Sequence, residues 1–285
     1  MVPATGPVPG DAQLTAQLVD TLTRRCPDRV AEGVALFTTD RQLREDIPDL
    51  NLRAGAAALL CTFGEPAVEA LHSGSLFERV RFGTTPNPNA IAQVLPAAPG
   101  DSLPTIVFNE RYRFEDFRAL SSVLFHETLH QDSQLDAKEE LIATAVQVLV
   151  YGQHVLANPE VATSGTELAR RLNTGLMARI NSGPGERLGL FTANGPSVLP
   201  GAVAPLPSFA DAFYPPGTPV PDTPGNATLR ASLALLGATP PPDADFDDAT
   251  LSYIDLTPGL TNAQVLELAR ILRLDVPRAP FFGSS

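Results

Sequence analysis

The pattern of hydrophobic and polar positions predicts a strand and two helices in succession near the middle of the chain. Residues 104–113 are rich in β-branched and aromatic residues, which is typical of a strand. Residues 114–125 contain neither Gly nor Pro and place apolar side chains at helical spacing, which predicts a helix. A second helix is predicted over 140–151, and the short polar connection before it indicates that the two helices pack antiparallel.

Apolar residues at helical spacing also predict helices in five other segments: 11–24, more weakly 68–77, 168–180, 229–236 and 265–272. The third of these helices follows a capping-box pattern at Ser164 and Glu167. Between 182 and 248, Pro and Gly recur every few residues. Apart from the short helix at 229–236, this density predicts long loops that wrap around the rest of the protein.

These patterns predict a mainly helical α+β fold with a small sheet and long Pro-rich loops. We expect three regions along the chain. Residues 1–110 supply N-terminal helices and an edge strand that form the upper part of a cleft, and residues 111–183 supply the two central helices. Residues 184–285 supply Pro/Gly-rich loops and a C-terminal helix packed on the core. A chain of 285 residues has ample material for that core.

A short motif, His126-Glu127-Thr128-Leu129-His130, follows directly on the first central helix. Residues four apart share one face of a helix, so the two imidazoles can bind one metal ion together. Glu127 then points at the open coordination position of that ion. Two imidazoles with an adjacent carboxylate are the ligand half of a hydrolytic zinc site. Only four histidines occur in the chain, which argues against a chance origin of this spacing.

The strand, the helix and the motif together resemble the zincin metallopeptidases over residues 104–156. The resemblance implies a zincin-like core, in which a sheet edge beside the active-site helix binds an extended substrate by strand addition. It implies zinc as the cofactor, with His126 and His130 as ligands. It also implies that Glu127 is the general base that activates water for hydrolysis of a peptide or protein substrate.

A catalytic zinc ion normally takes three protein ligands, so a third must lie outside the motif. Glu140 is favoured, because the Glu-Leu-Ile-Ala-Thr sequence that it begins is similar to the gluzincin pattern Glu-x-x-Ala-Asp/Asn. Glu139 is a second candidate, although it also fits a capping box begun by Asp136. Asp136 is a third candidate, six residues after His130 as in the metzincin layout, where Ser133 replaces the usual glycine.

Many zincins add a Tyr, His or Arg that stabilises the oxyanion from across the cleft. The resemblance leaves four candidates for this role: Tyr112, His154, Tyr214 and Tyr253. Tyr151 and His154 lie on the order of 15 to 20 Å beyond Glu140 along the predicted helix. That separation argues against a direct role for either residue.

Three other interpretations of the motif stay open. An ordinary helix can carry two histidines as surface or capping residues. A catalytically inactive relative can retain the zinc site and act as a peptide-binding or interaction protein, since fold and motif do not guarantee turnover. Peptide deformylases carry the same motif with a cysteine as third ligand, but the sequence around Cys61 lacks the surroundings of that family.

Charge and composition argue against two classes of partner. The net charge is −12 and Lys138 is the only lysine, so no nucleic-acid partner is expected. No apolar run is long enough for a membrane span, so no membrane partner is expected either. The Ala/Pro/Thr/Arg-rich composition favours a secreted or extracytoplasmic protein. Cys26 and Cys61 are compatible with one disulfide or with two buried thiols.

Overall fold

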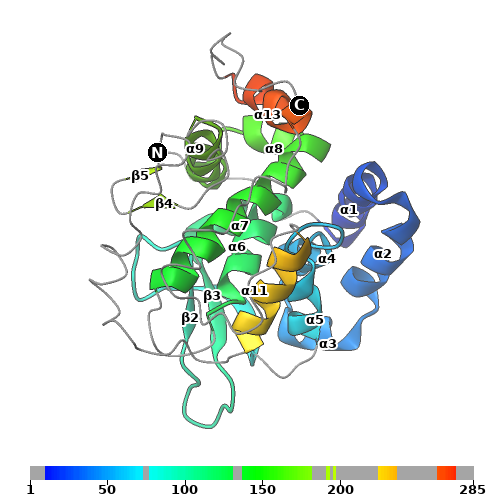
Figure 1. Ribbon diagram of the computed structural model, residues 1–285. Helices are drawn as coiled ribbons and strands as arrows, with labels where there is room; N and C mark the ends of the chain where they lie inside the picture. Colours follow the sequence, from blue (N-terminus) through cyan, green and yellow to red (C-terminus); the bar gives the residue numbers. More distant parts are fainter. Residues whose placement is uncertain are drawn as a thin grey trace.

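The computed structural model describes seven stretches of the chain: 10–72, 77–130, 137–181, 191–192, 195–196, 224–235 and 262–273. Over these residues the fold is mainly helical α+β with a small mixed sheet. Two helices, α6 (Phe117–Glu127) and α7 (Ala137–Ala157), lie at the centre (Figure 1). The predicted fold class is therefore confirmed at this level.

The N-terminal part is a group of helices beside α6: α1 (Asp11–Arg25), η1 (Pro27–Arg29), α2 (Val30–Thr38), α3 (Arg41–Asp46), α4 (Leu50–Ala57) and α5 (Pro66–His72). The helix predicted over 11–24 is confirmed by α1. The helix predicted over 68–77 is confirmed only in part, because α5 ends at His72 and Phe77 is not helical. The helices α2, α3 and α4 have no counterpart in the sequence-based prediction.

The close packing of α4 on α6 depends on a glycine. A Cβ atom on Gly55 would lie 3.1 Å from the backbone oxygen of Phe117 and 3.4 Å from the backbone nitrogen of Ser121. The 3.1 Å contact is tighter than most Cβ contacts in proteins, so a side chain here would require one backbone to move by a few tenths of an ångström. Asp49 starts α4 by accepting hydrogen bonds from the amides of Asn51 and Leu52. These residues fix the position of the helix that carries the motif.

The sheet contains β1 (Arg79–Gly83), β2 (Ala92–Leu95) and β3 (Thr105–Asn109) in the order β1-β3-β2. β1 is parallel to β3 and β2 is antiparallel to it, with Val80 and Val94 both opposite Ile106. The strand predicted at 104–113 is confirmed by the shorter β3, but its expected place at an edge is wrong, because β3 is the central strand. Its three middle residues are buried, so the apolar run reflects burial on both faces rather than one solvated face.

The strand leads through a 3-10 turn, η2 (Glu110–Tyr112), into α6. Asp116 caps α6 by accepting a hydrogen bond from the amide of Arg118. All residues of α6 are buried, because α4, α7, α9 and β2 all pack against it. The helix predicted before the motif is confirmed.

The second central helix, α7, returns antiparallel to α6, as predicted. Ser121, in the first half of α6, lies beside His154, near the end of α7, with 3.2 Å between Oγ and Nε2. The residues that connect the two helices, 131–136, lie outside the described part of the chain. Figure 1 shows α6 and α7 side by side through the middle of the molecule.

The C-terminal elements are α8 (Glu160–Thr163), α9 (Glu167–Asn181), α11 (Pro224–Leu235), α13 (Asn262–Ile271) and a two-stranded ribbon of β4 (Phe191–Thr192) and β5 (Gly195–Pro196). Three predicted helices are thus confirmed, and α11 starts earlier than expected. Pro224 can begin it because the first turn of a helix needs no amide from proline. Most of the segment predicted as Pro-rich loops lies outside the described residues.

The start of α9 differs from the predicted capping box. The Thr166 hydroxyl, rather than Ser164, accepts a hydrogen bond from the amide of Ala169. Ser164 instead follows α8 and donates its hydroxyl hydrogen bond to the carbonyl of Val161. The buried carboxylate of Glu115 accepts from the amide of Leu168, so a second group outside α9 satisfies its first turn.

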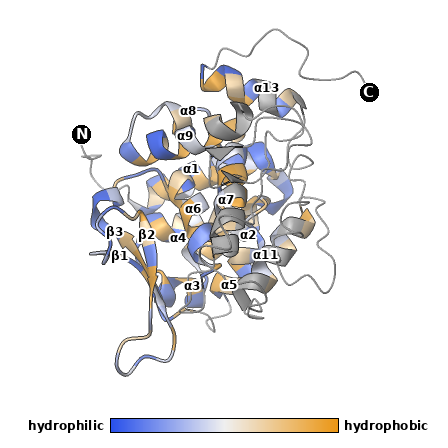
Figure 2. Cartoon of the chain, turned by 60° about the vertical axis from the view of Figure 1, so that its left-hand side comes forward, coloured by the Kyte–Doolittle hydropathy of each residue, from blue (hydrophilic) through white to orange (hydrophobic). Residues whose placement is uncertain are grey.

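The described elements share one hydrophobic core that extends from Leu14 in α1 to Ile271 in α13. Figure 2 shows hydrophobic segments gathered where α4, α6 and the sheet meet. The predicted division at 110/111 and 183/184 stays a prediction. No helix in the described part of the chain is long and apolar enough to cross a membrane.

Candidate metal centre

The motif begins in the last turn of α6 and ends in a tighter turn beyond it. The α-helix ends at Glu127, and Thr128 follows as the C-cap. The amide of Leu129 donates to the carbonyl of His126 at 3.1 Å, and that of His130 donates to Glu127 at 3.3 Å. Hydrogen bonds between residues three apart tighten the end of a helix. The sequence predicted that a regular helix would bring the two histidines together. In the structure, this tighter turn brings them together instead.

The two imidazoles of the motif converge on one point. The Nε2 atoms of His126 and His130 are 3.0 Å apart, and the ring planes meet at 64°. In a tetrahedral site, zinc–nitrogen bonds of about 2.0–2.1 Å place two imidazole nitrogens roughly 3.3 Å apart. The donor pair therefore fits one zinc ion after a shift of a few tenths of an ångström.

The motif is largely enclosed. His126 and Glu127 are each only 7% exposed to solvent, and Leu129 is fully buried. His130 is more exposed than either of its partners. The exposed part of the motif is therefore on the His130 side.

The side chains that could supply the third ligand lie outside the described part of the structure. Glu139 and Glu140 are part of α7, which packs against α6, but the structure describes only the backbone at these two positions. Asp136 lies outside them entirely. Among the described residues no group of three or more His, Cys, Asp or Glu side chains is arranged to hold a metal ion. Glu140 stays the predicted third ligand.

Of the four candidates for stabilising the oxyanion, Tyr112 and His154 lie in the described part of the chain. Tyr112 is buried, and its hydroxyl group bonds to Arg111, Arg171 and Glu167 at 2.6, 2.7 and 3.1 Å. These bonds hold it to α9 at the end of the sheet, before α6 begins. The residues Tyr214 and Tyr253 lie outside the described part of the chain.

His154 belongs to a separate buried cluster. Its Nδ1 atom lies 3.0 Å from Nη1 of Arg25, and its Nε2 atom lies 3.2 Å from Oγ of Ser121. A guanidinium can only donate, so Nδ1 accepts and the Nε2–H donates to the serine oxygen. Burial lowers the pKa of His154, and the charges of Arg25 and Arg118 lower it further. The ring is therefore neutral, and Ser121 is a hydrogen-bond acceptor rather than an activated nucleophile.

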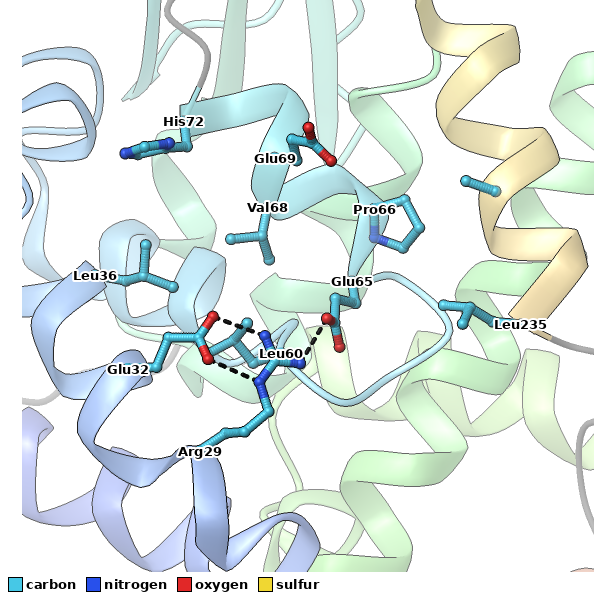
Figure 3. Close-up of a pocket in the computed structure, with 11 residues that line it drawn as sticks. Arg29, Glu32, Leu36, Leu60, Glu65, Pro66, Val68, Glu69, His72 and Leu235 are labelled. Atoms are coloured by element: carbon cyan, nitrogen blue, oxygen red, sulfur yellow. Dashed lines mark hydrogen bonds and ion pairs between the residues drawn. The ribbon is translucent and has the colours of Figure 1, made fainter.

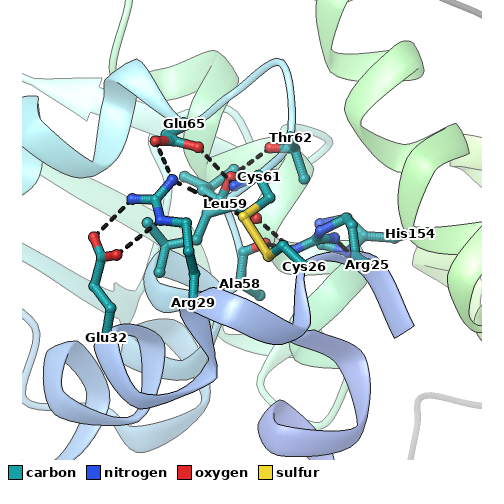
Figure 4. The surroundings of a disulfide bond; sticks show 11 residues. Arg25, Cys26, Arg29, Glu32, Ala58, Leu59, Cys61, Thr62, Glu65 and His154 are labelled. Carbon is teal, nitrogen blue, oxygen red and sulfur yellow. Dashed lines mark hydrogen bonds and ion pairs between the residues drawn. A yellow bond between two sulfur atoms is a disulfide. The ribbon is translucent and has the colours of Figure 1, made fainter. Parts of the chain in front are cut away.

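Cys26 and Cys61 form a disulfide, with 6.4 Å between their Cα atoms. It joins the end of α1 to the loop after α4, where Arg25 and Arg29 also bind (Figure 4). Because its sulfur is bonded to Cys26, Cys61 cannot act as a deformylase-type zinc ligand. Disulfides persist in oxidising compartments, which is consistent with the predicted extracytoplasmic location.

No family model, no curated protein and no solved structure matches the chain. The likeness to zincins therefore depends on the motif and its surroundings alone.

Proposed function

We propose that the protein is a zinc-dependent metallopeptidase of the zincin type. One observation carries the proposal: the Nε2 atoms of His126 and His130 converge to 3.0 Å at the end of a buried helix, with Glu127 between the two residues. His126 and His130 would hold zinc, together with Glu140 as the predicted third ligand. The buried setting strengthens electrostatic interactions at the site.

Zinc bound here would lower the pKa of a water ligand to about 7 and polarise the substrate carbonyl group. Glu127 would accept the proton of the attacking water on its carboxylate and then deliver it to the leaving amine.

The sheet supports a peptide as the substrate. In the described sheet β2 is an edge strand, and it packs beside α6, the helix that carries the motif. A free edge can pair with an extended peptide through main-chain hydrogen bonds. These bonds do not depend on the side chains of the peptide, so peptides of many sequences can bind. We propose that β2 holds the substrate next to the motif, in the role first expected for the 104–113 strand.

The proposed location is outside the cytoplasm. The Cys26–Cys61 disulfide and the lysine-poor composition support secretion.

Metal content and peptide cleavage test the proposal together. Elemental analysis of the purified protein should find about one zinc per chain, as expected for a single catalytic site. Cleavage of a mixed peptide library should stop after chelation and return with zinc. Glu127→Gln should keep zinc and lose cleavage, whereas Glu45→Gln, at an exposed surface ion pair with Arg41, should change neither. A protein without metal would refute the proposal.

A second candidate function is a zinc-containing peptide-binding protein without catalysis. The low exposure of Glu127 favours it, because a general base must reach the zinc-bound water. This candidate predicts one zinc per chain, equal peptide affinity in the wild type and Glu127→Gln, and no cleavage by either. Cleavage by the wild type alone would exclude it.

A further inference from the structure

A cavity of about 440 Å³ lies away from the motif, among α2, the loop after α4, α5 and α11 (Figure 3). None of its lining residues belongs to α6. Its volume falls within the range of about 300–1,000 Å³ typical of small-molecule sites. The cavity is therefore large enough for a ligand that the proposed peptidase centre does not involve.

The cavity is negatively charged. Its one guanidinium, Arg29, binds Glu32 at 2.7 Å and Glu65 at 2.6 Å, which holds both carboxylates in place across the cavity. Glu69 is a third carboxylate in the lining, and in the described part of the chain it has no hydrogen-bond or ion-pair partner. His72 does not neutralise it, because its imidazole pairs with Asp40 at 2.8 Å. The lining thus carries three carboxylates and one guanidinium.

The walls of the cavity also offer apolar surface. Val68 and Leu60 are buried in its wall, while Leu235 is 54% exposed at the edge supplied by α11. Among the described residues, Leu235 and Phe114 are the only large hydrophobic side chains that are exposed to solvent. A lining that contains both an exposed leucine and a carboxylate without a partner suits a ligand that carries both a positive charge and a carbon chain.

The charged wall is preorganised by the disulfide. The amide of Cys61 donates a hydrogen bond to Oε2 of Glu65 at 2.7 Å, and Cys26 anchors Cys61 to α1. The second oxygen of Glu65 is bound by Arg29. Because these groups are already fixed, a ligand would not need to order them on binding.

We propose that this cavity binds a small organic cation, an alkylguanidinium or alkylammonium compound. Glu69 pairs with the cationic group, and Val68 and Leu235 contact the carbon chain. The ligand is neither a metal ion, which would need several converging carboxylates, nor an anion, which the net negative lining repels.

Titration of the full-length protein with n-butylguanidinium, followed by amide NMR, tests the proposal. We expect saturable shifts in the millimolar range that are confined to the cavity around Arg29, Glu69 and Leu235. The neutral isostere n-butylurea should not produce them. Raised salt should weaken binding, because the ion pair is open to solvent.

Two variants at exposed positions separate the two parts of the interaction. Glu69→Gln should raise the dissociation constant of n-butylguanidinium by about two- to fivefold, the range of a solvent-accessible ion pair. Leu235→Ser should weaken n-butylguanidinium more than methylguanidinium, which lacks the chain. Glu45→Gln, an exposed carboxylate outside the cavity, controls for the overall charge of −12 and should have no effect.

Equal binding of n-butylurea and n-butylguanidinium would overturn the proposal, as would shifts spread over the whole acidic surface. Absence of saturation in the millimolar range would overturn it too. These results do not depend on zinc or on peptide cleavage, so they are separable from failure of the proposed peptidase function.

Discussion

His154 on α7 accepts a hydrogen bond at Nδ1 from Arg25 at the end of α1, with 3.0 Å between the two nitrogens. Burial lowers the pKa of Arg25 to about 10, so the guanidinium still carries its charge at neutral pH. The second terminal nitrogen of Arg25, Nη2, donates hydrogen bonds to the carbonyls of Ala58 and Leu60. One buried cation thus ties α1, the loop after α4, and α7 together, and it requires a neutral imidazole beside it.

Stability should therefore fall in mild acid because of His154. Its pKa is lowered in the folded state, so the unfolded chain binds more protons below its own pKa of about 6.5. The unfolding free energy should decrease as pH falls below that value, by up to about 1.4 kcal/mol per pH unit from this group. Urea unfolding between pH 7.5 and 5 measures the slope.

The His154→Gln variant isolates this contribution. Its side chain does not titrate, so its stability should depend less on pH than that of the wild type over the same range. His72→Gln serves as the control, since His72 is exposed on α5. Equal slopes in the wild type and His154→Gln would show that the buried imidazole does not control acid stability.

Removal of the disulfide should lower the unfolding free energy by about 4 kcal/mol. This value follows from the entropy that the unfolded chain loses when a cross-link joins residues 35 apart in sequence. The double variant Cys26→Ala, Cys61→Ala, compared with the wild type by denaturant unfolding under non-reducing conditions, measures the loss. The wild type under reducing conditions should approach the variant. Equal stability of oxidised wild type and variant would contradict a stabilising cross-link.

Local signals explain which elements were predicted from the sequence. The α6 helix and the motif could be predicted because Asp116 supplies a cap and apolar residues recur at helical spacing up to His126. Short helices such as α3 and α4 were missed, because few turns give weak periodicity. β3 was placed at an edge, since an apolar run does not show whether strands pair on one side or two.

The long-range contacts could not be predicted. Arg25 and His154 are 129 residues apart, and nothing in the sequence near either residue indicates that they meet. The same holds for Cys26 and Cys61, whose even count allowed a disulfide without requiring it. The convergence of His126 and His130 was predicted because it depends only on residues close together in the sequence, at the end of α6 and in the turn that follows.

Close contact between α4 and α6 should make Gly55 intolerant of larger side chains. Gly55→Val should destabilise the protein by about 1–3 kcal/mol, since its methyl groups would meet backbone atoms of Phe117 and Ser121. Ala35→Val, on an exposed position of α2, controls for the helix propensity of valine. Denaturant unfolding of both variants measures the difference. A Gly55→Val loss no larger than that of Ala35→Val would mean that the two helices are free to separate.

Single substitutions should identify the third zinc ligand. Because α7 packs on α6 and begins ten residues after Glu127, its first turns can bring a carboxylate to the motif. Alanine variants of Glu140, Glu139 and Asp136 are compared by zinc content after dialysis. Glu140→Ala should lose stoichiometric zinc, since two imidazoles alone bind zinc weakly, and Glu45→Ala should retain it. The Glu140 assignment fails if Glu140→Ala keeps zinc while Glu139→Ala or Asp136→Ala loses it.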